Sequence, residues 1–209
     1  MNSYLKFPAV LACTTLFAAG CAQRTSEREQ PPVTQPGEPM RPTEVGVRMP
    51  RTAERISSDA QISGVLNAAN QEEISLARLA LEKASDPEVK QFAQKILGDH
   101  SALDQRSQEL WTRLSVQAMA SDLQQQIQSD ADAAQKRFQT LEGVEFDRAY
   151  LEQEVNFHQQ LLTHIDQQLM PGAQNEDVKS LLTSARSSVS MHLTEAKALR
   201  DRMQAAPRG

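Results

Sequence analysis

The sequence predicts an all-α protein, an antiparallel four-helix bundle with an extra connecting helix between its second and third long helices. From Ser57 onward the chain is rich in Ala, Leu, Gln, Glu and Ser, a composition that favours helix over strand. Its apolar residues recur every three or four positions, which is the pattern of a helix with one buried face. Short turns join these segments in pairs, so neighbouring helices must run antiparallel.

The ends of the first hairpin follow from capping residues. Ser58 and Gln61 form a capping-box pattern, which predicts a helix over about 59–84. Ser85 is expected to cap the next helix, which has a proline in its first turn and extends over about 87–114. The connection is so short that these two helices are predicted to lie side by side.

A connecting segment precedes the second hairpin. Ser121 begins another amphipathic stretch that Gly143 interrupts, so we expect a separate helix crossing one end of the bundle. One long continuous helix is the alternative. Further long helices are expected over about 145–170, ended by Pro-Gly, and from near Asn175 onward. Two hairpins joined by a long connection describe a ferritin-like bundle.

The N-terminal residues 1–20 are predicted to be a signal peptide. Lys6 precedes an apolar run of about 14 residues, which is too short to span a bilayer comfortably. Small residues then precede Cys21, as in the lipobox of bacterial lipoproteins, and lipidation there would anchor the protein to a membrane. Ala22, rather than Asp, follows the cysteine, which points to the outer membrane, facing the periplasm. The alternative is an ordinary cleaved signal and a soluble periplasmic protein.

Composition divides the remainder of the chain and excludes several classes of function. Residues 21–56 contain six of the ten prolines and are expected to be a disordered tether, leaving 57–204 for the bundle and 205–209 for a tail. A net charge of −5 argues against nucleic-acid binding. Both cysteines, Cys13 and Cys21, precede the expected domain, which excludes a disulfide or thiolate site there.

Each long helix has one ionisable residue on its apolar face, where a leucine would pack better. A buried carboxylate without a partner costs several kcal/mol, so these residues are expected to meet one another. Heights estimated at about 1.5 Å per residue from the shared hairpin ends place three of them in one layer, with His192 up to a turn away. The four residues are Glu73, His100, His158 and His192.

Two interpretations of this layer remain open. The first is a mononuclear metal site of three imidazoles and one carboxylate, which suits Zn, Cu, Fe or Ni. Asp104, Glu154 and Glu195 are then spaced to hold the histidine rings as outer partners, and Tyr150 lies close enough for its hydroxyl to reach the layer. The second is a hydrogen-bonded polar layer that only fixes the register of the helices.

Other sites receive less support from the sequence. A ferritin-type di-iron centre needs Glu-x-x-His motifs and several inward carboxylates, whereas the sequence has no such motif and one carboxylate on an apolar face. His164 lies off the apolar face and is expected in solvent, Asp99 is expected on the surface or between helices, and Asp147 suits the positive end of a helix. No nucleophile–base pair is evident, so an enzyme ranks below binding and structural roles.

Three segments resemble a bacterial family, the domain of unknown function 4142. They are NQEEISLARLALEKASDPEVKQFAQKILGDH, FDRAYLEQEVNFH and MHLTEAKAL, within residues 59–203. The resemblance implies a ferritin-like bundle in a predicted outer-membrane protein, without an established activity. Its motif positions fall on Glu73, His100, His158, His192, Phe146, Asp147 and Tyr150.

The chain departs from the family pattern before its last histidine. Ser188-Val189 stands where the family commonly has Leu-Pro, which removes an expected kink. The functional expectation is a cell-envelope lipoprotein with a metal-binding layer, for storage or sensing. The alternative is a non-enzymatic structural or interaction module whose Glu/His layer only fixes the fold. The sequence identifies no protein partner beyond the membrane.

Overall fold

The prediction of an all-helical protein is confirmed. The computed structural model describes residues 55–205, and this part of the chain contains helices and no strand. No helix in this range is long and apolar enough to cross a membrane. The expected signal peptide, Cys21 and nearly all of the expected tether lie outside it. The elements are α1 (Asp59–Lys83), α2 (Pro87–Arg113), α3 (Asp122–Gln139), α4 (Gly143–His164), the π-helical turn η1 (Ile165–Leu169), α5 (Met170–Gly172) and α6 (Glu176–Ala205).

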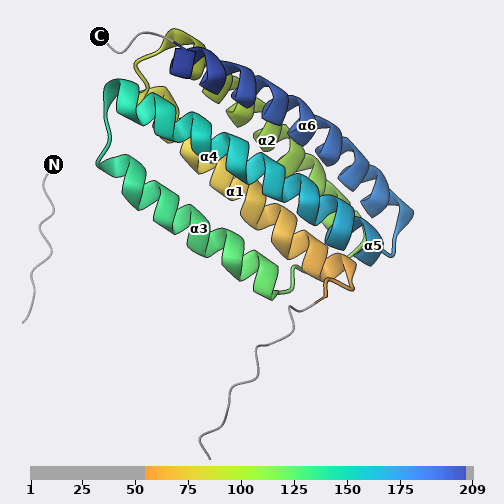
Figure 1. Ribbon diagram of the computed structural model, residues 1–209. Helices are drawn as coiled ribbons and strands as arrows, with labels where there is room; N and C mark the ends of the chain where they lie inside the picture. The colour runs from red at the N-terminus through yellow and green to blue at the C-terminus, as the bar shows by residue number, and fades with distance from the viewer. Residues whose placement is uncertain (1–54, 206–209) are drawn as a thin grey trace, which may run out of the picture. The chain divides into compact units, whose positions relative to one another are not determined.

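Two helical hairpins form the body of the domain. α1 packs mainly on α2 and α4 on α6, while α2 also contacts α6 (Figure 1). The predicted capping box is present, because the Ser58 hydroxyl accepts a hydrogen bond from the Gln61 amide. The expected cap at Ser85 is wrong: Asp86 caps α2 by accepting from the amides of Glu88 and Val89. Ser85 is instead bonded to Asp147 on α4, which leaves Asp86 to cap α2.

The connecting helix α3 is separate from α4, as expected, but it does not cross one end of the bundle. It runs alongside α1 for most of that helix (Figure 1). The Met119 amide donates to Ala60 O near the start of α1, and the Lys83 ammonium donates to Gln139 O at its other end. Its buried face is narrow, formed by Ile127, Ala134 and Phe138. A covering helix of this kind can bury those residues only by lying lengthwise.

The break between α3 and α4 occurs where the sequence indicated. Gly143 has a φ of +58°, a left-handed conformation that glycine adopts without strain. α4 then continues through η1 and α5 to Gly172, past the expected end at Met170. A side chain at Gly172 would collide with Ile56 O at 2.5 Å, so the glycine allows Ile56 to pack against this end of the bundle. Ile56, from the range expected to be tether, is buried there.

Two apolar clusters fill the bundle, one toward each end. The first includes Leu66, Leu103 and Val189, and the second includes Leu76, Ile96 and Ala196. On α1, α2 and α6 the buried ionisable residues fall between these positions in the sequence. The functional candidates therefore occupy a layer between the two clusters, away from bulk water.

Candidate metal centre

The three histidines that the sequence singled out lie together in this layer. α2, α4 and α6 contribute His100, His158 and His192, whose rings are 5.3–5.8 Å apart between centroids. All three are buried, and one ring nitrogen from each lies within 4.8 Å of the other two. The expected displacement of His192 by up to a turn is not observed. The estimate of about 1.5 Å per residue assumed a regular α-helix ending at Met170, whereas this helical segment includes the π-helical turn η1 and ends at Gly172.

Each imidazole has one nitrogen held by an outer acceptor. His158 Nδ1 donates to the backbone oxygen of Glu154 at 2.9 Å, and His192 Nε2 donates to Asp99 Oδ2 at 2.8 Å. His100 Nδ1 lies 3.1 Å from Asn70 Oδ1, with the amide oxygen facing the ring. Such contacts fix the tautomer of a ring and place a lone pair on its other nitrogen.

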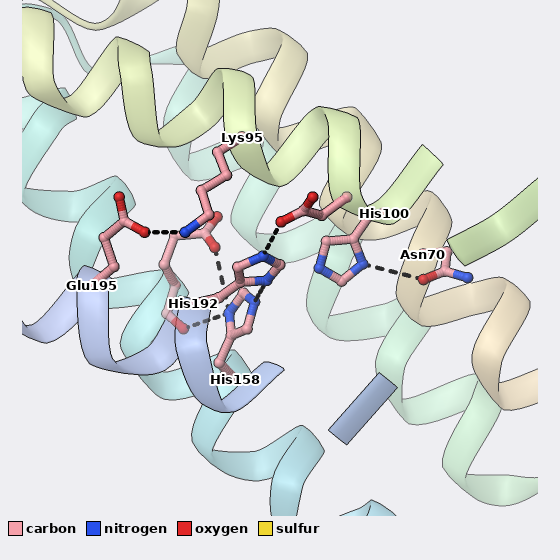
Figure 2. A network of polar contacts seen from close by, with 8 residues as sticks. Asn70, Lys95, His100, His158, His192 and Glu195 are labelled. Carbon is pink, nitrogen blue, oxygen red and sulfur yellow. Dashed lines mark hydrogen bonds and ion pairs between the residues drawn. The ribbon is translucent and has the colours of Figure 1, made fainter. Parts of the chain in front are cut away.

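The remaining nitrogens face one another. His158 Nε2 and His192 Nδ1 are 3.3 Å apart. Each of these two rings carries its proton on the other nitrogen, which donates to Glu154 O in one case and to Asp99 Oδ2 in the other. His100 Nε2 is buried without a hydrogen-bond partner, and its ring edge turns toward the other two rings (Figure 2). Three nitrogen lone pairs thus converge. This arrangement is unfavourable without a proton or cation between them and is well suited to binding a metal ion.

Burial keeps the three rings neutral, which is the state that a metal requires. Desolvation lowers the pKa of His158 to about 3 and lowers the pKa of His100 well below its usual value, and the neighbouring histidines add to both effects. Desolvation also lowers the pKa of His192, although Asp99 opposes this change.

Glu73 belongs to a second group rather than to the three histidines. Its carboxylate lies with Glu154 and His158, and one ligand atom from each lies within 4.8 Å of the others. Glu154 Oε2 is 3.4 Å from His158 Nδ1. Desolvation raises the pKa of Glu73 well above its usual value, and the charge of Glu154 adds to it; desolvation raises the pKa of Glu154 to about 7.

The other sequence-selected residues fall in different places. The Tyr150 side chain is fully buried, with its hydroxyl beside Glu154 and Glu73. Asp104 accepts hydrogen bonds from Gln71 and Gln108 instead of holding a histidine ring. Glu195 pairs with Lys95 across α2 and α6 (Figure 2).

Three contributors to the layer lie outside the four residues that the sequence singled out. Asn70 was not considered, although it lies one helical turn before Glu73 on α1. Asp99 was assigned to the surface or to an interhelix position, and it is the second of these that it occupies. Glu154 is predicted as an outer partner of the His158 ring; its fully buried carboxylate lies 3.4 Å from that ring's Nδ1 and also adjoins Glu73. The spacing of Tyr150, Glu154 and His158, four residues apart on one face of a helix, was the available signal.

The sequence matches the family described as Domain of unknown function (DUF4142) over residues 47–199. The chain belongs to this family. The match includes both residue groups of the layer. A comparison of this DUF4142 chain with curated proteins finds no match.

Solved structures with the same fold extend the comparison. A DUF305 protein from Streptomyces coelicolor, described as secreted, has a TM-score of 0.59 at 15% identity, covering 73% of this DUF4142 chain and 98% of its own. CopM in its Cu(II)-bound form has a TM-score of 0.55 at 19% identity, covering 69% and 98%. The Cu(I)-bound form of CopM has a TM-score of 0.55 at 22% identity, covering 69% and 96%. These likenesses establish a shared helical fold.

Proposed function

We propose that this DUF4142 protein is a cell-envelope protein that binds one transition-metal ion at His100, His158 and His192, for storage or sensing. Three neutral imidazoles suit Zn, Cu, Fe or Ni. Copper is the first candidate, because CopM, which shares the fold, has been solved with Cu(II) and Cu(I) bound.

The convergence of three lone pairs is the observation on which this proposal depends. A polar layer that only fixed helix register would pair its donors and acceptors internally. Here the three outer acceptors, Asn70 Oδ1, Glu154 O and Asp99 Oδ2, take the ring protons. The inner nitrogens of all three rings are then left without donors.

The location and the finer fold assignment are parts of the same proposal. Lipidation of Cys21 would tether the domain to the outer membrane through the proline-rich segment 21–56, with the domain in the periplasm. The two hairpins, packed together through α2 and α6, support classification as a ferritin-like four-helix bundle.

Copper binding by the untagged chain tests the proposal. After loading with excess copper and desalting, elemental analysis should find about one ion per wild-type chain, and a His100→Gln/His192→Gln variant should retain a small fraction of it. His164→Gln is the matched control, because that histidine is half-buried outside the layer and bonded to Gln168. It should bind copper as the wild type does.

The register-fixing alternative makes the opposite prediction. In that case the wild type, the double variant and the His164→Gln control would contain equal, substoichiometric metal. Circular dichroism of each apo variant establishes that the helices are intact. Zinc, iron and nickel loaded in the same way then rank the metals that the histidines prefer.

A further inference from the structure

We infer that Glu73 and Glu154 form a second cation site, on the opposite edge of His158 from the histidine centre, which selects an oxygen-preferring divalent ion such as Mn²⁺. This goes beyond the proposed copper site, and its test does not require copper. The geometry places Glu73, Glu154 and His158 ligand atoms within 4.8 Å of one another. Carboxylate oxygens suit Mn²⁺, whereas three imidazoles suit copper.

The two carboxyl groups have few hydrogen-bond partners. Both oxygens of Glu154 and one oxygen of Glu73 are buried without a hydrogen-bond partner. The neutral His158 ring places its Nδ1–H group 3.4 Å from Glu154 Oε2, and among the described residues no cationic side chain pairs with either acid. Buried acids with so few partners are costly unless a cation or protons occupy the space between them.

Tyr150 provides an independent observation that points to a ligand. Its side chain is fully buried, and its hydroxyl interacts with Glu154, beside Glu73, but no described residue completes its hydrogen-bond geometry. A third oxygen thus adjoins the two carboxylates, on the side of the layer away from the three inner nitrogens.

A groove beside the layer provides a route for cations. It lies between α3 and α4, has a volume of about 430 Å³, and is lined by residues that include Asp130 and Gln153. Glu72 is close to Asp130 at this groove and to Glu154 in the core, and it is only 4% exposed. Acidic side chains therefore lead from the groove toward the two carboxylates.

Manganese binding to the purified full chain tests the inference. Free Mn²⁺ gives a sharp electron paramagnetic resonance signal that bound Mn²⁺ loses, so a titration yields stoichiometry and affinity. We expect about one Mn²⁺ per wild-type chain. Glu154→Gln, which keeps the side-chain shape, should weaken binding at least tenfold, and so should Glu73→Gln. Glu152→Gln is the matched control, because Glu152 lies on the same helix with its side chain 47% exposed.

The two sites can fail separately in this design. The His100→Gln/His192→Gln variant should lose copper and still bind one Mn²⁺. The inference is overturned if the wild type binds no Mn²⁺ at millimolar concentration, or if Glu154→Gln and Glu152→Gln bind it equally. Either result would mean that the two acids hold protons only, and it would leave the copper proposal standing.

Discussion

Two buried carboxylates on α4, about two helical turns apart, differ sharply in their surroundings. Asp147 accepts from the amides of Ser85 and Asp86, at 3.0 Å each, and from the Ser85 hydroxyl. Glu154 is equally buried, but no described residue reaches full hydrogen-bond geometry with its oxygens, and His158 Nδ1 is 3.4 Å from Oε2. A buried acid with a full set of donors stabilises the fold. A buried acid without them is destabilising, so it indicates a site that a ligand completes.

The largest effect should come from removing the satisfied acid. Asp147→Ala leaves the donors of the α1–α2 turn unpaired, so we expect the free energy of unfolding to fall by about 3 kcal/mol. Urea denaturation of the apo protein measures this change. Copper stoichiometry at low temperature should stay at the wild-type value, because Asp147 is remote from the histidines. A loss below about 1 kcal/mol would contradict a structural role for Asp147.

The outer acceptors of the histidines should have the next largest effect. Asn70→Ala and Asp99→Ala each remove the acceptor that holds one histidine ring in a single tautomer. This loss should weaken copper binding about 10- to 100-fold. Competition with a chromophoric chelator measures the affinity. Asp104→Ala is the control, since sequence spacing favours Asp104 as a ring partner but its carboxylate contacts Gln71 and Gln108. Equal affinities in all three variants would show that the rings need no such support.

The smallest expected effect is a change of stability with pH that comes from Glu72, the buried acid near Asp130 and Glu154. Desolvation raises the pKa of Glu72 to about 8, with the charges of Glu154 and Asp130 adding to it. A folded-state pKa above the unfolded one means that the folded chain retains a proton that the unfolded chain releases near pH 4.5. The stability from this group is therefore complete below that pH and is lost as the pH rises through 8.

Histidine burial changes stability in the opposite direction and over a lower range. The pKa of His158 falls to about 3 in the folded chain, so its contribution grows as the pH rises from 3 to about 6.5 and changes little above that. Between pH 7 and 8, Glu72 should thus lower apo stability by about 1 kcal/mol, in addition to losses in the same direction from Glu73 and Glu154. Urea unfolding at each pH should show this slope in Glu82→Gln, where the altered acid is exposed, and a shallower slope in Glu72→Gln.

Much of the fold was accessible from the sequence because periodicity and caps are local. The buried faces of α1 and α2, the capping box at Ser58 and the break before Gly143 were all predicted. The path of α3 was not, because the direction in which a short amphipathic helix lies depends on distant partners. The cap of α2 was also missed, since Ser85 is diverted by Asp147, a contact made across the bundle.

In the candidate site, too, the sequence predicted the features that depend on local pattern and missed those that depend on distant contacts. Placing polar residues on the apolar faces identified all three histidines and Glu73. Depth along the bundle could not be counted reliably, because a π-helical turn at Ile165–Leu169 interrupts the α-helical rise and the helix then continues to Gly172. The sequence therefore suggested one group of four, whereas the structure contains two groups that share His158.

X-ray absorption spectroscopy of the copper-loaded, untagged chain tests the central claim most directly. Imidazole rings give a distinctive multiple-scattering pattern, and nitrogen ligands lie at about 2.0 Å from such metals. We predict three imidazole neighbours in the wild-type protein and the loss of this pattern in His100→Gln/His192→Gln. A copper shell of sulfur atoms, or one without imidazole, would contradict binding at the three buried histidines.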